Sequence, residues 1–240
     1  MKPNSSNTLP ILLLIIAILG TSFTACGQRR GSKRKTANTE RVKDSKRQAA
    51  LARASSTSIS ATEWEPNKEA TVTFNEFPTT LAQWKEMQKQ LGSEPQGAVA
   101  LQVMAFELYR NNRTDGEQAL RLNNTSTNYN STVERLREIM GKDQYYARPY
   151  IAWAMLQGAT PENGYYVRPP YTISMKVDPN KKYQESQLLK GTVIYLLVDS
   201  KGWDTNWRGV EVVKQAGSNY YVVSNCPAMY TQCKEAKARK

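Results

Sequence analysis

The sequence of 240 residues contains no histidine, and this limits the chemistry that the chain can perform. Nucleophiles activated by histidine and histidine-ligated metal centres are excluded, so an enzyme would have to use carboxylates, lysine or tyrosine. Glu134 and Glu138 stand four residues apart on a predicted helix and could face a common cleft. At this spacing, however, exposed charge on a surface helix is far commoner than a catalytic acid pair. No acid pair stands out, which disfavours an enzyme.

Two tryptophans stand four residues apart in the segment 202–208, between two predicted strands. Asp204 and Asn206 lie between Trp203 and Trp207 and carry groups that can bind hydroxyls. An aromatic face beside such groups suits a sugar, whose apolar face stacks while its hydroxyls form hydrogen bonds. We therefore hypothesise that these four residues mark a recognition site for a glycan or a protein. The alternative is that both indoles close the end of the sheet core.

The N-terminus combines a short polar stretch, in which Lys2 is the one cation, with an unbroken apolar run over residues 11–19. A transmembrane helix needs about 20 apolar residues, whereas the apolar part of a secretory signal needs only about 7 to 15. The run is too short for a membrane span. Residues 1–25 are therefore predicted to form a removable export signal.

Thr24 and Ala25 stand directly before Cys26, and together with the apolar run they resemble the lipobox of bacterial lipoproteins. The resemblance implies cleavage before Cys26 and attachment of lipid to its thiol, so that fatty acids such as palmitate anchor the protein on a membrane. Phe23 departs from the usual leucine, which leaves cleavage of an ordinary signal peptide open. Gly27 stands where aspartate would favour the inner membrane, so we expect a place in the cell envelope at the outer membrane.

The other two cysteines, Cys226 and Cys233, are predicted to form a disulfide, because export leads to an oxidising compartment. Two thiols without histidine do not complete a tetrahedral zinc site. Asp199, Asp204 and Asn206 could offer oxygens to calcium but lack the spacing of an EF-hand loop. Nothing resembles a P-loop or a dinucleotide fingerprint. We therefore expect neither a metal nor a cofactor.

The net charge of +12 is concentrated in one segment. Residues 29–53 contain ten basic residues against two acids, while the chain beyond them carries 22 basic and 19 acidic residues. The segment is rich in serine, threonine and alanine and has no aromatic residue to stack on a base. Residues 26–66 are therefore predicted to be a basic disordered tether, and nucleic acid is not expected as a partner.

Beyond the tether, helical periodicity comes first and strand patterns follow. One short strand is predicted over 71–77. Helices are predicted over 81–91, 95–111, 115–122, 133–140 and 149–157, and strands over 171–177, 192–198, 210–214 and 220–223. This order predicts an α+β fold, in which a helical half packs on a C-terminal antiparallel β-meander, as one domain over residues 67–240.

Residues 150–165, YIAWAMLQGATPENGY, and the PYT that follows at 170–172 resemble an uncharacterised bacterial domain family. In that family a helical region, a G-A-T-P-x-N-G-Y turn and a P-Y-T strand precede terminal β-hairpins. The resemblance covers about residues 70–225, and the turn is its specific part. It implies a fold but no known activity.

Eleven of the thirteen tyrosines follow residue 144, and exposed aromatic faces suit sugar rings or other proteins, although sheet packing accounts for many of them. The interpretation that fits every feature is a lipid-anchored exported envelope protein acting as a binding or structural module, whose ligand the sequence does not identify. Its expected partners are a membrane, through lipid on Cys26, and a glycan or an envelope protein. The alternatives are a carboxylate-based glycan or peptidoglycan hydrolase and a carrier of an apolar ligand.

Overall fold

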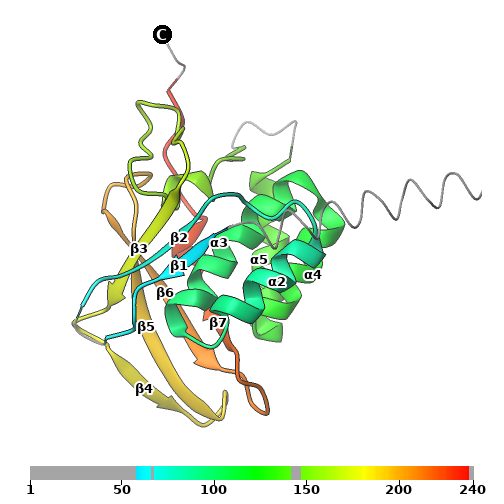
Figure 1. The fold of residues 1–240 in the computed structure, drawn as a ribbon, viewed down its shortest axis with the longest axis vertical. Helices are drawn as coiled ribbons and strands as arrows, with labels where there is room; N and C mark the ends of the chain where they lie inside the picture. Colours follow the sequence, from blue (N-terminus) through cyan, green and yellow to red (C-terminus); the bar gives the residue numbers. More distant parts are fainter. Residues whose placement is uncertain (1–57, 66–67, 142–146, 238–240) are drawn as a thin grey trace, which may run out of the picture. The chain divides into compact units, whose positions relative to one another are not determined.

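A computed structural model describes residues 58–65, 68–141 and 147–237. The predicted export signal, Cys26 and the basic part of the tether lie outside the described residues. Four helices come before most of the sheet in the described part of the chain, so the predicted α+β class is confirmed. Figure 1 shows these helices gathered on one side of the sheet.

Helix α2 (Leu81–Leu91) begins and ends where the sequence predicts. The hydroxyl of Thr80 caps it by accepting a hydrogen bond from the backbone N–H of Gln83 at 3.2 Å. Its buried face includes Trp84, whose indole N–H donates to the carbonyl of Leu101 in the next helix at 3.0 Å. The large apolar residues at helical spacing therefore form the buried face of α2, and this face packs against the next helix.

Helix α3 (Pro95–Asn111) is the centre of the domain. Pro95 occupies its first turn, where no backbone donor is needed, and every residue from Pro95 to Tyr109 is buried. A helix that is apolar nearly all round needs partners on every side. It accordingly lies against α2, the following helix and the sheet.

Helices α4 (Arg113–Asn123) and α5 (Ser126–Ile139) are both longer than predicted. The first half of α5 is rich in polar residues, which hides its helical character in the sequence. One of these side chains belongs to a buried polar network: the amide of Asn128 donates to Asn124 at 2.5 Å, and that of Asn124 donates to Gln102 of α3 at 2.9 Å. Because polar residues are buried here, the start of α5 lacks the apolar periodicity on which the prediction of a helix from residue 133 depended.

The sheet has seven strands in the described part of the chain, and all neighbouring strands are antiparallel. The strands are β1 (Ile59–Ala61), β2 (Ala70–Phe74), β3 (Tyr171–Val177), β4 (Tyr183–Ser186), β5 (Gly191–Asp199), β6 (Trp207–Lys214) and β7 (Tyr221–Asn225). Their order is β1-β2-β3-β5-β6-β7, with β4 beside β5. The last three strands form the predicted meander, and β1 and β2 extend the sheet from the N-terminal side.

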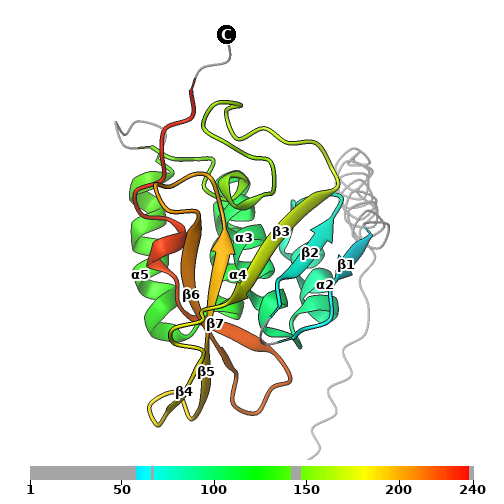
Figure 2. The same cartoon turned by 90° about the vertical axis from the view of Figure 1, so that its left-hand side faces the viewer.

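Alternation along the strands separates the two faces of the sheet. Met175 of β3 and Leu196 and Val198 of β5 are buried against the helices, whereas Lys176 and Tyr195 lie on the outer face. Figure 2 shows this outer face toward the viewer with the helices behind it. The loop before β3 and the C-terminal tail stand at one end of the sheet, and β4 lies at the other.

Three details of the predicted organisation are corrected. Strand β1 lies inside the predicted tether, so the folded part begins before residue 67. Strand β4 was not predicted. In place of a helix over 149–157 there is one short 3-10 turn, Trp153–Met155. Among the described residues, no helix has the length and apolar character that crossing a membrane requires.

Candidate functional site

The segment from Gly158 to Tyr166 folds into a turn that its own side chains close. Gly158 and Gly164 have φ values of +80° and +63°, which glycine adopts without steric cost. The side-chain oxygen of Asn163 accepts from the N–H of Thr160 at 3.0 Å, and its amide donates to the carbonyl of Gly158 at 2.8 Å. The G-A-T-P-x-N-G-Y pattern thus specifies the shape of a turn.

Tyr165 ends this turn and is braced by the C-terminal tail. Its ring stacks on Tyr150, with centroids 4.8 Å apart and planes at 20°. Its hydroxyl donates to the carbonyl of Lys234 at 3.0 Å, and the N–H of Ala236 donates to the hydroxyl of Tyr150 at 3.0 Å. Tyr165 has φ +57°, a strained value that persists only where the surroundings hold it.

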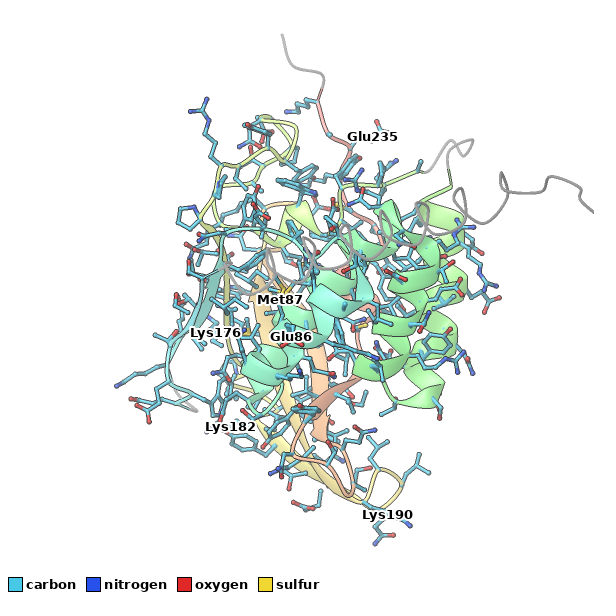
Figure 3. All side chains as sticks on the ribbon, turned by 45° about the vertical axis from the view of Figure 1, so that its right-hand side comes forward. Glu86, Met87, Lys176, Lys182, Lys190 and Glu235 are labelled. Atoms are coloured by element: carbon cyan, nitrogen blue, oxygen red, sulfur yellow. The ribbon has the colours of Figure 1, made fainter. Side chains whose placement is uncertain are left out.

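Further contacts hold the tail against the loop that contains the turn. The N–H of Lys237 donates to the carbonyl of Pro161 at 2.8 Å, and Arg148 forms an ion pair with Glu235 at 3.2 Å. Glu235 lies at the end of the domain opposite Lys190 in Figure 3. The tail is therefore part of the structure that shapes this end.

A hollow of about 240 Å³, open to solvent, lies beside the braced turn. It is lined by Arg110, Pro149, Tyr150, Trp153, Gly164, Tyr165 and Tyr166. Among the lining residues, Tyr166 is 50% exposed and Trp153 is half-buried. The described lining residues combine aromatic faces with one guanidinium group and include no carboxylate, a composition typical of a binding site.

A row of aromatic rings holds Trp153 in place. Trp153 packs edge-on against Tyr171, with centroids 5.4 Å apart, and also lies 5.4 Å from Phe77. Phe77 in turn packs against the buried Phe74 of β2 at 5.0 Å. Such edge-to-face contacts restrict ring orientation, so Trp153 forms a rigid wall of the hollow.

Arg110, the cation of the lining, is held by a buried carboxylate. Its Nε donates to Glu107 at 2.9 Å and its Nη2 at 2.5 Å, while the amide of Asn111 donates to the same carboxylate at 2.9 Å. The side chain of Glu107 is 3% exposed. Hydrogen bonding to Glu107 raises the pKa of Arg110 further above its already high value, so the guanidinium stays charged.

Of the four residues predicted to recognise a ligand, Trp203 lies in the core. It is 3% exposed, and its indole N–H donates to the carbonyl of Thr231 at 2.5 Å. The guanidinium of Arg208 lies 5.1 Å from the ring centroid. A ring enclosed in this way has no open face, which matches the alternative that this indole closes the end of the sheet core.

The other three predicted residues are more open. Trp207 is half-buried on the sheet, with the ammonium of Lys176 3.9 Å from its ring centroid. Asn206 is exposed, and the side chain of Asp204 is 95% exposed and forms an ion pair with Lys234 at 3.1 Å. The structure therefore does not present the two tryptophans as one aromatic platform.

The predicted disulfide is absent from the structure, in which Cys226 and Cys233 are both free and buried. Cys226 accepts from the amides of Asn128 at 3.5 Å and Gln102 at 3.6 Å, whereas Cys233 donates to the hydroxyl of Tyr165 at 3.8 Å. Each thiol thus has partners of its own on different elements. Burial raises the pKa of both thiols to about 11, so both are protonated near neutral pH.

Among the residues that the structure describes, neither a catalytic acid pair nor a metal centre accompanies the hollow. Glu134 and Glu138 are exposed on α5, where Glu138 pairs with Arg135, and neither lines the hollow. In the described segments, no group of three or more histidine, cysteine, aspartate or glutamate residues could hold a metal ion. The site is therefore suited to binding through aromatic faces and hydrogen bonds.

The sequence did not single out the residues that line the hollow. Tyr150, Tyr165 and Tyr166 belong to the tyrosine-rich part of the chain, and Gly164 and Tyr165 end the turn motif. That motif was the one signal that could have found them. Arg110 carried none, because it is an ordinary arginine near the end of a helix.

A family model with the description "Domain of unknown function (DUF6935)" matches residues 76–237, which is more than half of the chain. The match includes the hollow and the tail that braces it. No curated protein and no solved structure matches the chain.

Proposed function

The chain belongs to the family described as "Domain of unknown function (DUF6935)", and we propose that it is a lipid-anchored protein of the bacterial envelope whose folded domain is a binding module. Export and anchoring are supported by the apolar run before the lipobox-like residues and Cys26. The partners that we propose are a membrane, through lipid on Cys26, and a glycan or an envelope protein. Gly27 supports the outer membrane as its location.

The observation that carries the binding proposal is the aromatic hollow, defined by the seven residues that line it. Its walls are held in place: Tyr150 and Tyr165 by the tail, Trp153 by neighbouring rings, and Arg110 by Glu107. A site whose side chains are fixed before the ligand arrives loses less entropy on binding. Preorganised aromatic faces are what a binding module requires.

Binding accounts for this site better than hydrolysis or transport does. Hydrolysis of a glycosidic bond requires two carboxyl groups that flank it, and none is found among the described residues that line the hollow. A carrier of an apolar molecule would need space between the helices and the sheet. That interface is occupied by the buried side chains of α3, among them Leu101, Met104 and Phe106.

We expect Cys26→Ser to abolish lipid attachment, because the sulfur atom is the acceptor of the lipid. Metabolic labelling of cells with a fatty-acid probe measures this directly, and the variant should remain unprocessed or appear unlabelled in the soluble fraction. Cys233→Ser provides the matched control and should keep the label if the variant accumulates. Equal labelling of the wild type and Cys26→Ser would refute the lipid anchor.

We expect Tyr166→Ala to weaken retention of the detergent-solubilised full-length protein on isolated cell-wall and polysaccharide fractions by about tenfold, since stacking on an aromatic ring contributes roughly 0.5 to 1.5 kcal/mol beyond area burial. Tyr183→Ala is the matched control, because Tyr183 is a similarly exposed tyrosine on β4 at the other end of the sheet. Its retention should equal that of the wild type. Retention that is the same for both variants and the wild type would remove the hollow as the binding site.

A further inference from the structure

The chemistry of the lining narrows the class of ligand. The part of the hollow that the structure describes offers the faces of four aromatic rings and one guanidinium, with no carboxylate. A purely apolar ligand would use the ring faces but would accept no hydrogen bond from the guanidinium, and a cationic ligand would find no carboxylate among the described lining residues to pair with. A ligand with both an apolar face and hydrogen-bonding groups satisfies both parts of the lining.

The buried carboxylate of Glu107 holds Arg110 in place at the hollow. Glu107 lies on α3 among residues that are almost all buried, and its carboxylate is occupied by Arg110 and Asn111. Replacing such a buried ion pair by apolar residues is often neutral or stabilising, so the pair is weak support for the fold. Its structural consequence is to fix the plane of the Arg110 guanidinium at the hollow.

The ion pair with Glu107 also determines which nitrogen atoms of Arg110 remain for a ligand and what net charge the ligand meets. Nε and Nη2 are bonded to Glu107, and these bonds do not use Nη1. Glu107 cancels the charge of the guanidinium, so the pair attracts a free anion only weakly but still donates hydrogen bonds. Hydroxyl oxygens are suitable acceptors for such a donor.

The size of the hollow limits how much of a ligand it holds. Its volume of about 240 Å³ is below the roughly 300 to 1,000 Å³ of sites that enclose a drug-sized molecule. One ring therefore enters, and the remainder of the ligand stays outside. The hollow is open to solvent, so the remainder of the ligand can extend outward from it.

Resting on the proposed function, we infer that the hollow receives one pyranose ring of an uncharged glycan. The apolar face of the sugar stacks on the aromatic wall that Trp153 and Tyr166 provide. Its hydroxyls accept hydrogen bonds from Nη1 of Arg110. Glu107 acts as a positioning residue that holds Arg110 and sets the preference for neutral sugars.

The test is titration of the detergent-solubilised full-length protein with three soluble oligosaccharides, made of neutral hexoses, N-acetylhexosamines or uronic acids. Calorimetry should show binding of a neutral or N-acetylated oligosaccharide with an affinity that changes little with salt. Tyr166→Ala and Arg110→Lys should each reduce this affinity by about tenfold. Arg113→Lys, on the neighbouring helix α4 and outside the hollow, should leave it unchanged.

Glu107→Gln separates positioning from a merely structural role. It leaves the charge of Arg110 uncompensated, so the preference of the protein should move several-fold toward uronic acids and become salt-dependent. If this variant does not fold, Arg110→Lys and Tyr166→Ala still test whether the hollow binds the sugar. Both residues are exposed at the site. Melting temperatures close to that of the wild type show that an affinity loss is local.

Two outcomes would overturn the inference in different ways. If none of the three oligosaccharides binds, or if the wild type prefers uronic acids with a steep salt dependence, the neutral-sugar class is wrong. In that case Tyr166→Ala should still reduce retention on envelope fractions, and the hollow remains the site of an unidentified partner. If Tyr166→Ala changes neither retention nor titration, the hollow itself fails as the binding site.

Discussion

Gly116→Ala should lower the free energy of unfolding by about 3 kcal/mol, although alanine is the better helix former by about 1 kcal/mol. Gly116 lies in α4, where this helix passes close to α3. A Cβ atom there would stand 2.1 Å from the Cα and 2.4 Å from the backbone nitrogen of Tyr109. Backbone atoms cannot swing aside, so the two helices would have to separate and open the core.

The measurement is urea unfolding followed by circular dichroism, with Thr114→Ala as the control. Thr114 is exposed on the same helix, so its replacement should change stability by no more than about 0.5 kcal/mol. A Gly116→Ala protein that is as stable as the wild type, or more stable, would contradict the close approach of α3 and α4. The sign of the change therefore distinguishes packing from intrinsic helix propensity.

Trp203→Ala should cost about 3 to 5 kcal/mol of stability, the range measured for removal of a large aromatic side chain from a core. The indole is enclosed beneath Arg208, and its N–H is satisfied by the carbonyl of Thr231. Truncation would leave both a cavity and an unpaired carbonyl. The same unfolding measurement applies to the full-length protein.

Trp207→Ala is the matched comparison, because Trp207 is the same residue type four positions along the chain and is half-buried. Its replacement should cost roughly 1 kcal/mol, since much of its surface is already in contact with solvent. Similar losses of stability for Trp203→Ala and Trp207→Ala would contradict the difference in burial between the two tryptophans. A loss of glycan binding by Trp207→Ala at unchanged stability would restore that residue as part of a recognition site.

The C-terminal tail links the core to the hollow. The N–H of Lys234 donates to the carbonyl of Gly202 at 2.8 Å, directly beside Trp203, and the carbonyl of Lys234 accepts from Tyr165 in the wall of the hollow. Truncation of Trp203 should therefore loosen the wall as well as the core. For this reason binding data on Trp203 variants cannot test recognition, whereas data on Tyr166 variants can.

Local signals in the sequence were sufficient to define several elements. Helix α2 has a capping threonine and apolar residues at helical spacing, α3 has Pro95 in its first turn, and β3 follows a pair of prolines; all three begin and end as predicted. Each signal arises from neighbouring residues and needs no distant partner. The α+β class followed from the order of these elements.

Elements that depend on distant partners were misjudged. The start of α5 is polar in part because Asn128 bonds to Asn124 within the buried network that includes Gln102. Strand β1 is a short segment that is ordered by pairing with β2, and β4 is an exposed strand that pairs with the first half of β5. Backbone pairing across the sheet leaves little trace in composition when side chains face solvent.

The predictions of export and of lipid on Cys26 rest on residues 1–26, because a signal sequence is read as a linear segment, and the fold does not alter them. The site was different. Spacing placed Trp203 and Trp207 together, but only packing decides that one is enclosed and the other open. The hollow joins Arg110 of a helix to a loop that begins about forty residues later, and a tail beyond residue 230 braces its wall. Likewise, the nearness of Cys226 and Cys233 in sequence could not reveal that each thiol points to different partners, because side-chain direction is set by the elements that surround it.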